Sequence, residues 1–225
     1  MPFDGARGVA AGAVVGYRLH RMVRAEVEYL MRTSDYSQSS GVRSSEGVNA
    51  DKLSDELFLA QEWLGLVTSR TLMGNILLDL PGIAGRATPF VGLGAGVGRT
   101  KADYASVWSR NTDPAAIVTG RNQPNAEEIA RNLAGTSSSG RNTMRDVQAA
   151  YQLLAGFDYP LADAVSVDLR IRWTVFDEFS GTFVWDPLRS HVPNVRRDGS
   201  EPVYAIMSTD DFSYVGLGLG LKYHF

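Results

Sequence analysis

Side chains along most of this chain alternate between two characters, and this period of two restricts its fold more than any other feature. In residues 212–225 (FSYVGLGLGLKYHF), apolar side chains take the odd positions from Val215 to Phe225, and glycine, lysine and histidine take the even ones. Successive side chains of a β-strand point to opposite faces of a sheet. Strict alternation therefore predicts a strand with one apolar face and one small or polar face.

Six further segments show the same alternation. They lie at residues 9–19, 23–31, 57–80, 91–97, 151–159 and 165–175. Segment 57–80 is the longest and the least regular. One segment with a helical pattern, residues 125–133 (NAEEIARNL), lies between two of these strands and predicts a short helix in a loop. We expect an all-β, antiparallel up-and-down fold that forms a single domain over residues 1–225.

The connectors between these strands alternate between short and long. Tight turns near residues 20–22, 81–89 and 160–164 alternate with long segments at about residues 33–56, 109–145 and 180–210, which are predicted to be outer loops. This alternation is typical of membrane β-barrels, which have short turns at one end and longer loops at the other. The sequence therefore predicts a transmembrane β-barrel, of which seven strands are identifiable.

Composition excludes several other classes of protein. The 225 residues are 44% hydrophobic, include no cysteine and carry a formal net charge of -3. Without cysteine the chain has no disulfide, no thiolate nucleophile and no cysteine-based metal site. The small net charge argues against a nucleic-acid partner. No apolar run reaches the roughly 20 residues that a membrane-spanning helix needs.

Charged residues gather on the polar faces of the predicted strands. Because the interior of a small barrel is just wide enough for side chains to fill, we expect these charges to form a structural, salt-bridged network inside the barrel. A soluble barrel also alternates, but it should carry large apolar residues inside. The predicted network comprises Arg24, Glu26, Glu28, Asp168, Arg170 and Arg172.

Aromatic residues on the apolar faces gather near the two ends of the strands. We expect Tyr17, Tyr159, Tyr223 and Phe225 to lie at the membrane interface near the tight turns. Tyr29, Tyr151 and Trp173 fall nearer the loops. Two such bands match the aromatic girdles of membrane proteins.

Several short motifs, taken in order, carry a family resemblance. They are residues 12–17 (GAVVGY), 24–29 (RAEVEY), 72–79 (LMGNILLD), 89–98 (PFVGLGAGVG), 151–156 (YQLLAG), 166–173 (SVDLRIRW) and 218–225 (GLGLKYHF). Together they resemble small bacterial outer-membrane β-barrel proteins of the OmpA-like and surface-antigen families. The resemblance implies eight strands and a location in the bacterial outer membrane.

The same resemblance implies partners. Leu219, Leu221, Tyr223 and Phe225 are similar to the C-terminal signal that the outer-membrane assembly machinery reads. Outer-membrane lipids and lipopolysaccharide are expected around the barrel, and the loops could contact another envelope component or a host surface. No cofactor and no metal are implied.

The beginning of the chain departs from this family pattern. Members of the family usually carry a signal peptide and one further strand before the glycine-rich strand found here at residues 8–19, whereas residues 1–5 (MPFDG) have no signal-peptide character. An open seven-stranded sheet would also leave two unpaired edges. We therefore expect a truncated chain or a misplaced start that lacks the first strand.

Three functions remain open at this point. The expected role is structural or a surface interaction, adhesin-like or antigen-like, through the long loops. The alternatives are a narrow channel and, third, a lipid A-modifying enzyme, for which the candidate residues are Ser190, His191 and Asp186 in a loop and His20 and His224 near the turns. We expect no enzyme, because a nucleophile needs a base and an orienting acid within hydrogen-bonding reach.

Two further patterns have simple structural explanations. The glycines at 92, 94, 96 and 98 repeat every two residues, which fits one face of a strand in a crowded interior rather than a phosphate-binding loop. Asp210 and Asp211 could hold a weak calcium ion, but a solvated strand entrance explains them as well.

Overall fold

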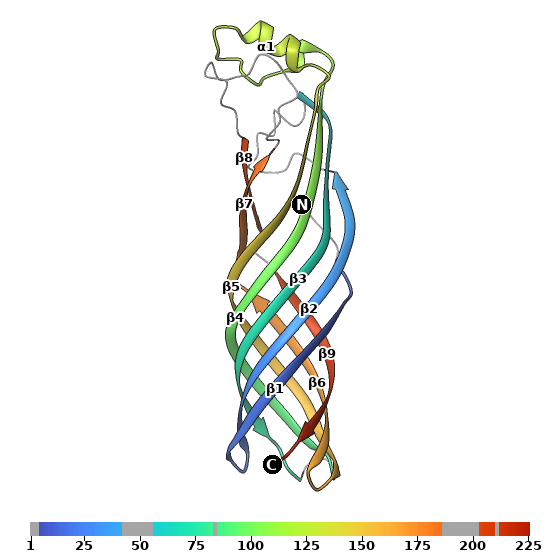
Figure 1. Ribbon diagram of the computed structural model, residues 1–225, viewed down its shortest axis with the longest axis vertical. Coiled ribbons are helices and arrows are strands. Elements are labelled where there is room, and N and C mark those ends of the chain that lie inside the picture. The colour runs from blue at the N-terminus through green and yellow to red at the C-terminus, as the bar shows by residue number, and fades with distance from the viewer. Residues whose placement is uncertain (1–4, 42–55, 83–84, 186–202, 210–211) are drawn as a thin grey trace.

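The computed structural model describes residues 5–41, 56–82, 85–185, 203–209 and 212–225. Seven strands form one antiparallel sheet in the order β1-β2-β3-β4-β5-β6-β9. The sheet curls around a long axis, so that its two edge strands lie on either side of one groove (Figure 1). The strands are β1 (Gly8–His20), β2 (Val23–Gly41), β3 (Leu57–Asp79), β4 (Thr88–Arg110), β5 (Ser137–Ala162), β6 (Val165–Phe176) and β9 (Ser213–Tyr223).

The seven strands expected from the alternation are all present in this sheet. In β6 the even positions are buried and the odd positions are half-buried or exposed, as the period of two requires. We call the concave side the inner face and the convex side the outer face. The end that carries the turns β1–β2, β3–β4 and β5–β6 is the turn end, and the opposite end is the loop end.

The two edges of the sheet are not joined. Within the described residues, β1 pairs with β2 alone and β9 with β6 alone. Both edge strands run toward the turn end, so direct pairing between them would be parallel in a sheet whose six other pairings are antiparallel. The described strands therefore form an open sheet, and the closed barrel implied by the resemblance is not observed.

Several segments expected in outer loops are strands instead. β2 continues to Gly41, β4 ends at Arg110 and β5 begins at Ser137, so residues 33–41, 109–110 and 137–145 extend the sheet at the loop end. A second hairpin, β7 (Phe179–Trp185) with β8 (Val203–Thr209), occupies part of the segment 180–210. The described part of the loop-end extension, which we call the stalk, is built mainly from β2 to β5 and the β7–β8 hairpin (Figure 1).

A bulge explains why segment 57–80 alternates irregularly. The register of β3 against β4 shifts between Leu64 and Val67. An extra residue in one strand reverses which side chains face inward beyond that point. The odd–even alternation of inward and outward side chains is therefore interrupted at the bulge, although the strand continues.

The interior of the stalk contains an apolar cluster. Val67, Ala102, Tyr104, Met144 and Phe179 form its buried cluster, and Phe212 packs against them. This cluster combines residues of the sheet with one residue of the β7–β8 hairpin. It anchors the hairpin to the inner face of the stalk.

A folded cap occupies the connector between β4 and β5. It contains a 3-10 turn, η2 (Pro114–Ala116), and the helix α1 (Ala126–Leu133), which confirms the helix predicted at residues 125–133. Ile117, Ile129 and Leu133 form a small buried core. Below them the carboxylate of Glu56 accepts hydrogen bonds from the backbone N–H groups of Val118 (3.0 Å) and Thr119 (2.9 Å).

Candidate functional site

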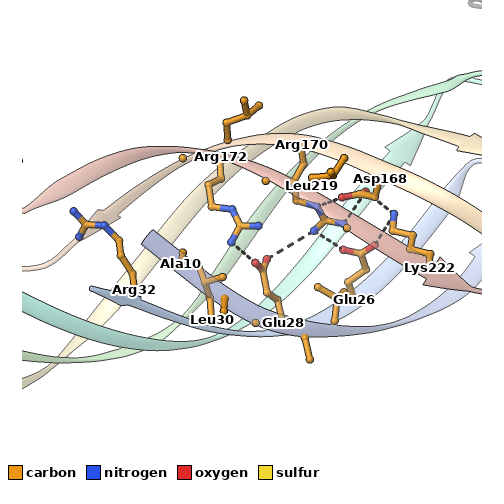
Figure 2. A pocket seen from close by; sticks show the side chains of 18 of the residues that line it. Ala10, Glu26, Glu28, Leu30, Arg32, Asp168, Arg170, Arg172, Leu219 and Lys222 are labelled. Carbon is orange, nitrogen blue, oxygen red and sulfur yellow. Dashed lines mark hydrogen bonds and ion pairs between the residues drawn. The ribbon is translucent and has the colours of Figure 1, made fainter. Parts of the chain in front are cut away.

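The predicted charge network lies on the inner face and crosses the interior between two strands that are not neighbours. Arg170 of β6 lies 3.2 Å from Glu26 of β2 (Nη1 to Oε2), and Arg172 of β6 forms an ion pair with Glu28 of β2 (Figure 2). Arg170 also donates from Nε and Nη2 to the two carboxylate oxygens of Asp168, at 2.6 and 3.0 Å. These side chains are almost completely buried. The fold thus brings together β2 and β6, the strands next to the two open edges.

Arg24 and Lys222 extend the network toward the turn end. Arg24 lies 2.7 Å from Asp158, 3.2 Å from Glu26 and 3.4 Å from Asp79. Lys222 of β9 lies 2.6 Å from both Asp158 and Asp168. All six predicted residues are therefore in one network. The sequence prediction missed Asp79, Asp158 and Lys222, although each falls at one of the alternate positions that face inward on its strand.

An amide layer closes the network at its other end. Gln152 donates to Asn75 (2.7 Å) and to Glu28 (3.2 Å), and Asn75 donates to Glu28 (3.3 Å). The sequence contained a signal for these residues too, because Asn75 and Gln152 fall on the polar face of their segments. Neutral amides satisfy the carboxylate oxygens that the arginines leave free, which a buried carboxylate requires.

The ring of Phe90 lies among three of these cations. The guanidinium carbon of Arg24 is 5.2 Å from the ring centroid, that of Arg170 is 5.7 Å away, and Lys222 Nζ is 5.4 Å away. Phe90 also packs with Leu77 and Leu154 in a small apolar cluster. Cations within about 6 Å of an aromatic face are attracted to it. The Phe90 ring therefore fills the space between Arg24, Arg170 and Lys222.

The glycines of β4 agree with the interpretation of a crowded interior. A Cβ added at Gly94 would collide with the side-chain oxygen of Asn75, and one at Gly98 would lie 2.5 Å from the Phe176 ring. Larger side chains at these two positions would have to displace the inner layer.

The outer face is apolar along roughly ten residues of most strands, which is the length that a tilted strand needs to cross a bilayer. On β9, Val215, Leu217, Leu219 and Leu221 each expose more than 70% of their surface. The same belt continues over the other strands of the sheet. Its exposed members include Val9, Val15, Val27, Leu72, Ile76, Val91, Leu93, Val97, Val147, Leu153 and Ile171. We call this surface the apolar belt.

The predicted interface aromatics lie on the belt at the turn end. Tyr17 pairs in register with Ala25 near the β1–β2 turn, Tyr159 with Val167, and Tyr223 with Val165, next to the β5–β6 turn. All are exposed, as is Phe225. Tyr29, Tyr151 and Trp173 lie on the same face toward the loop end. Aromatic residues therefore gather toward both ends of the belt, and their place at a membrane interface stays a prediction.

A groove of about 1890 Å³ separates the edges β1 and β9. The inner charges Glu26, Glu28, Arg170 and Arg172 line its floor. Arg32 also lines it, with its guanidinium carbon 4.5 Å from the centroid of the Tyr214 ring. Nη1 of Arg32 is buried and has no hydrogen-bond partner among the described residues.

The residues considered for catalysis are not assembled into a site in the described structure. His20 ends β1 and His224 follows β9 at the turn end, where His224 Nε2 lies 2.9 Å from Ser166 Oγ. Ser190, His191 and Asp186, like Asp210 and Asp211, lie outside the described residues. Within the described ranges, no group of three or more histidines, aspartates or glutamates is placed to hold a metal ion.

Comparison with protein-family models, with curated proteins and with solved structures found no match. In the part of the chain that the structure describes, none of the helices has the length and apolar character to cross a membrane.

Proposed function

We propose that this chain spans the bacterial outer membrane as a β-barrel and has a structural or surface-interaction role through its loop end. The observation that carries the proposal is the inverted distribution of polarity. At the level of the apolar belt, Leu219 exposes 78% of its surface while Arg170 exposes 3%. In a sheet that spans a membrane, apolar side chains contact lipid on the outer face, and charges on the inner face are stable because they are paired.

The proposal includes closure of the sheet by one more strand, whatever its source. A strand antiparallel to both β1 and β9 would continue the alternating directions of the sheet and satisfy the two rows of unpaired backbone groups, which are costly in lipid. It would lie over the groove and would place a hydrogen-bond acceptor near Nη1 of Arg32. The result would be a barrel of the eight-strand type.

Insertion is tested by quenching of tryptophan fluorescence with brominated phospholipids in vesicles. The chain has four tryptophans, and variants that keep only Trp173 or only Trp63, with phenylalanine at the other three positions, give a matched pair. Trp173 lies on the apolar belt, and Trp63 lies beyond the bulge in the stalk. We expect strong quenching for Trp173 and little for Trp63. Equal, weak quenching of both would contradict insertion.

Orientation is tested with introduced cysteines, because the chain has none of its own. Arg121→Cys places a thiol in the cap and Arg21→Cys places one in the β1–β2 turn; both positions are exposed. In intact cells a membrane-impermeant maleimide should label the first variant and not the second. Labelling of the turn alone would reverse the proposed orientation.

The surface role is tested by removing the cap. The backbones of Asn111 and Gly135 are joined by a hydrogen bond of 2.9 Å, so an Asn-Gly hairpin turn could replace residues 112–134 without moving β4 or β5. Assembly in the membrane should persist, and any cell adhesion that depends on the full-length protein should be lost. Retention of adhesion would restrict the proposal to a structural role in the envelope.

The filled interior favours this role over a channel. Buried ion pairs, amides and Phe90 occupy the cross-section between β2 and β6. We expect planar bilayers that contain the assembled protein to show no sustained conductance. Stable single-channel currents would favour the alternative of a narrow channel.

A further inference from the structure

Four cations gather on the outer face where the apolar belt ends and the stalk begins. Arg70 of β3 lies directly opposite Arg99 of β4, and Lys101 of β4 lies directly opposite Arg145 of β5. Arg99 and Lys101 are two residues apart and therefore share the same face. We call these four residues the basic band.

The basic band is only partly compensated within the described structure. Lys101 Nζ lies 3.6 Å from Asp103, with both side chains more than 40% exposed. Among the described residues, no carboxylate forms an ion pair with Arg70, Arg99 or Arg145. Like charges directly opposite each other destabilise a sheet. The inner network, in contrast, pairs every one of its arginines with a carboxylate.

The position of the band points to the source of the missing negative charge. Leu72 and Val97 form the next outward row below Arg70 and Arg99, and both are exposed apolar residues of the belt. Side chains one row above a lipid-facing surface lie at the depth of the headgroups, where anionic phosphates are concentrated. Arginine binds phosphate through two parallel N–H donors, which makes it suited to such a partner.

We infer that the basic band binds the phosphate groups of membrane lipids at the loop end of the belt. The inference rests on the proposed membrane insertion and adds a specific lipid chemistry to it. A phosphate between two opposed cations removes their repulsion and fixes the height of the sheet in the bilayer. Two such opposed pairs on adjacent rows can hold two phosphates, or one lipid that carries two.

The test compares lipid preference at two reporters in vesicles of phosphatidylcholine and phosphatidylglycerol. In a background with phenylalanine at all four native tryptophan positions, Val97→Trp reports on lipid beside the band, and Leu217→Trp reports on the belt at β9. Either the anionic or the zwitterionic lipid is brominated, and quenching gives the relative affinity of the two lipids at each reporter. We expect a preference for phosphatidylglycerol of five-fold or more at Val97→Trp and almost none at Leu217→Trp.

Charge-removing variants then assign the preference to the band. Arg99→Gln together with Lys101→Gln should abolish the preference at the Val97→Trp reporter, whereas Arg121→Gln together with Arg131→Gln, an equal change of charge in the cap, should leave it intact. Because Arg99→Gln also removes a repulsion, it should raise the unfolding temperature in a neutral detergent and lower it in anionic vesicles. This reversal of sign would not occur if Arg99 had only a packing role.

Three results would overturn the inference. They are equal lipid preference at both reporters, a preference that survives Arg99→Gln with Lys101→Gln, and loss of the preference on addition of millimolar inorganic phosphate, which would assign the band to a free anion. An absence of quenching at both reporters and at Trp173 would instead contradict membrane insertion, and the inference with it.

Discussion

The belt and the stalk distribute polar and apolar side chains differently between the two faces of the sheet. At the level of the belt, β4 presents Val91 and Leu93 outward, and the interior beside it holds Arg24 and Arg170. In the stalk, β4 presents Lys101 and Asp103 outward and buries Ala102 and Tyr104. The change occurs within a few residues, at the row of Arg70 and Arg99.

Under the proposed function, this difference follows from what surrounds each region of the sheet. A stalk in water needs an apolar interior, because burial of apolar surface drives its folding. A belt in lipid gains nothing from an apolar interior, so it can hold buried charges provided that they are paired. The inversion is therefore the observation that most supports the proposed membrane boundary, and each prediction below tests one side of it.

The largest effect is expected from Arg170→Ala. This change removes a cation that Glu26 and Asp168 share, and breaking a buried ion pair costs about 3–5 kcal/mol. Urea unfolding of the protein in vesicles measures the loss, with Arg131→Ala on the exposed helix α1 as the control. An unchanged unfolding midpoint would show that the network does not stabilise the sheet.

The next largest effect is expected from a charge placed on the outer face of the belt. Leu219→Lys puts a cation in the middle of β9, where lipid contact should cost about 2–4 kcal/mol. Ser139→Lys, on the exposed outer face of the stalk, should have little effect. Equal tolerance of the two substitutions in vesicles would contradict a lipid-facing belt.

A smaller and local effect is expected from Met144→Ala in the stalk. Met144 is buried against Val67, Tyr104 and Phe179, and its truncation should cost about 2 kcal/mol. Hydrogen exchange should accelerate at residues 100–106 and 140–146 and remain slow at residues 167–173. If exchange accelerated equally in both segments, the stalk and the belt would unfold as one unit.

The smallest effect concerns pH. Burial of Glu62 in the stalk raises the pKa of its carboxyl, against an opposing hydrogen bond from Tyr104. The folded stalk therefore retains a proton that the unfolded chain loses above about pH 4.3, so stability falls as the pH rises from there through the raised pKa. Glu62→Gln should flatten this dependence in melts followed by Trp63 fluorescence. A slope equal to that of the unmodified chain would assign the dependence to another group.

Much of the sheet could be predicted from the sequence because a strand has only two faces. The alternation at residues 165–175 was enough to place Asp168, Arg170 and Arg172 on one side and Trp173 on the other, and the structure confirms this. Turns such as that at residues 163–164 follow from the residues between the strands. These are local properties of the chain, and they do not depend on which strands become neighbours.

The stalk was not predicted, because its pattern is reversed and interrupted. Beyond Arg99 the next two outward residues of β4 are charged, and its inward residues Ala102 and Tyr104 lie between the polar Thr100 and Ser106. The bulge at Leu64 and Val67 also breaks the odd–even pattern of β3. The β7–β8 hairpin lies within a segment whose composition resembles a loop, and its first residue, Phe179, is fixed by packing against Met144 and Tyr104. Long-range packing of this kind has no local signature.

By itself, the amino-acid sequence determined the strands, their two faces, the short helix of the cap and the set of charges that share a face. Only the tertiary structure decided which of those charges meet. Glu26 and Arg170 are separated by 144 positions and by several strands of the sheet, and they come within 3.2 Å because the sheet curls until β2 and β6 face each other. Curvature is a property of the whole sheet, arising from strand twist and bulges, and no single segment of the sequence encodes it.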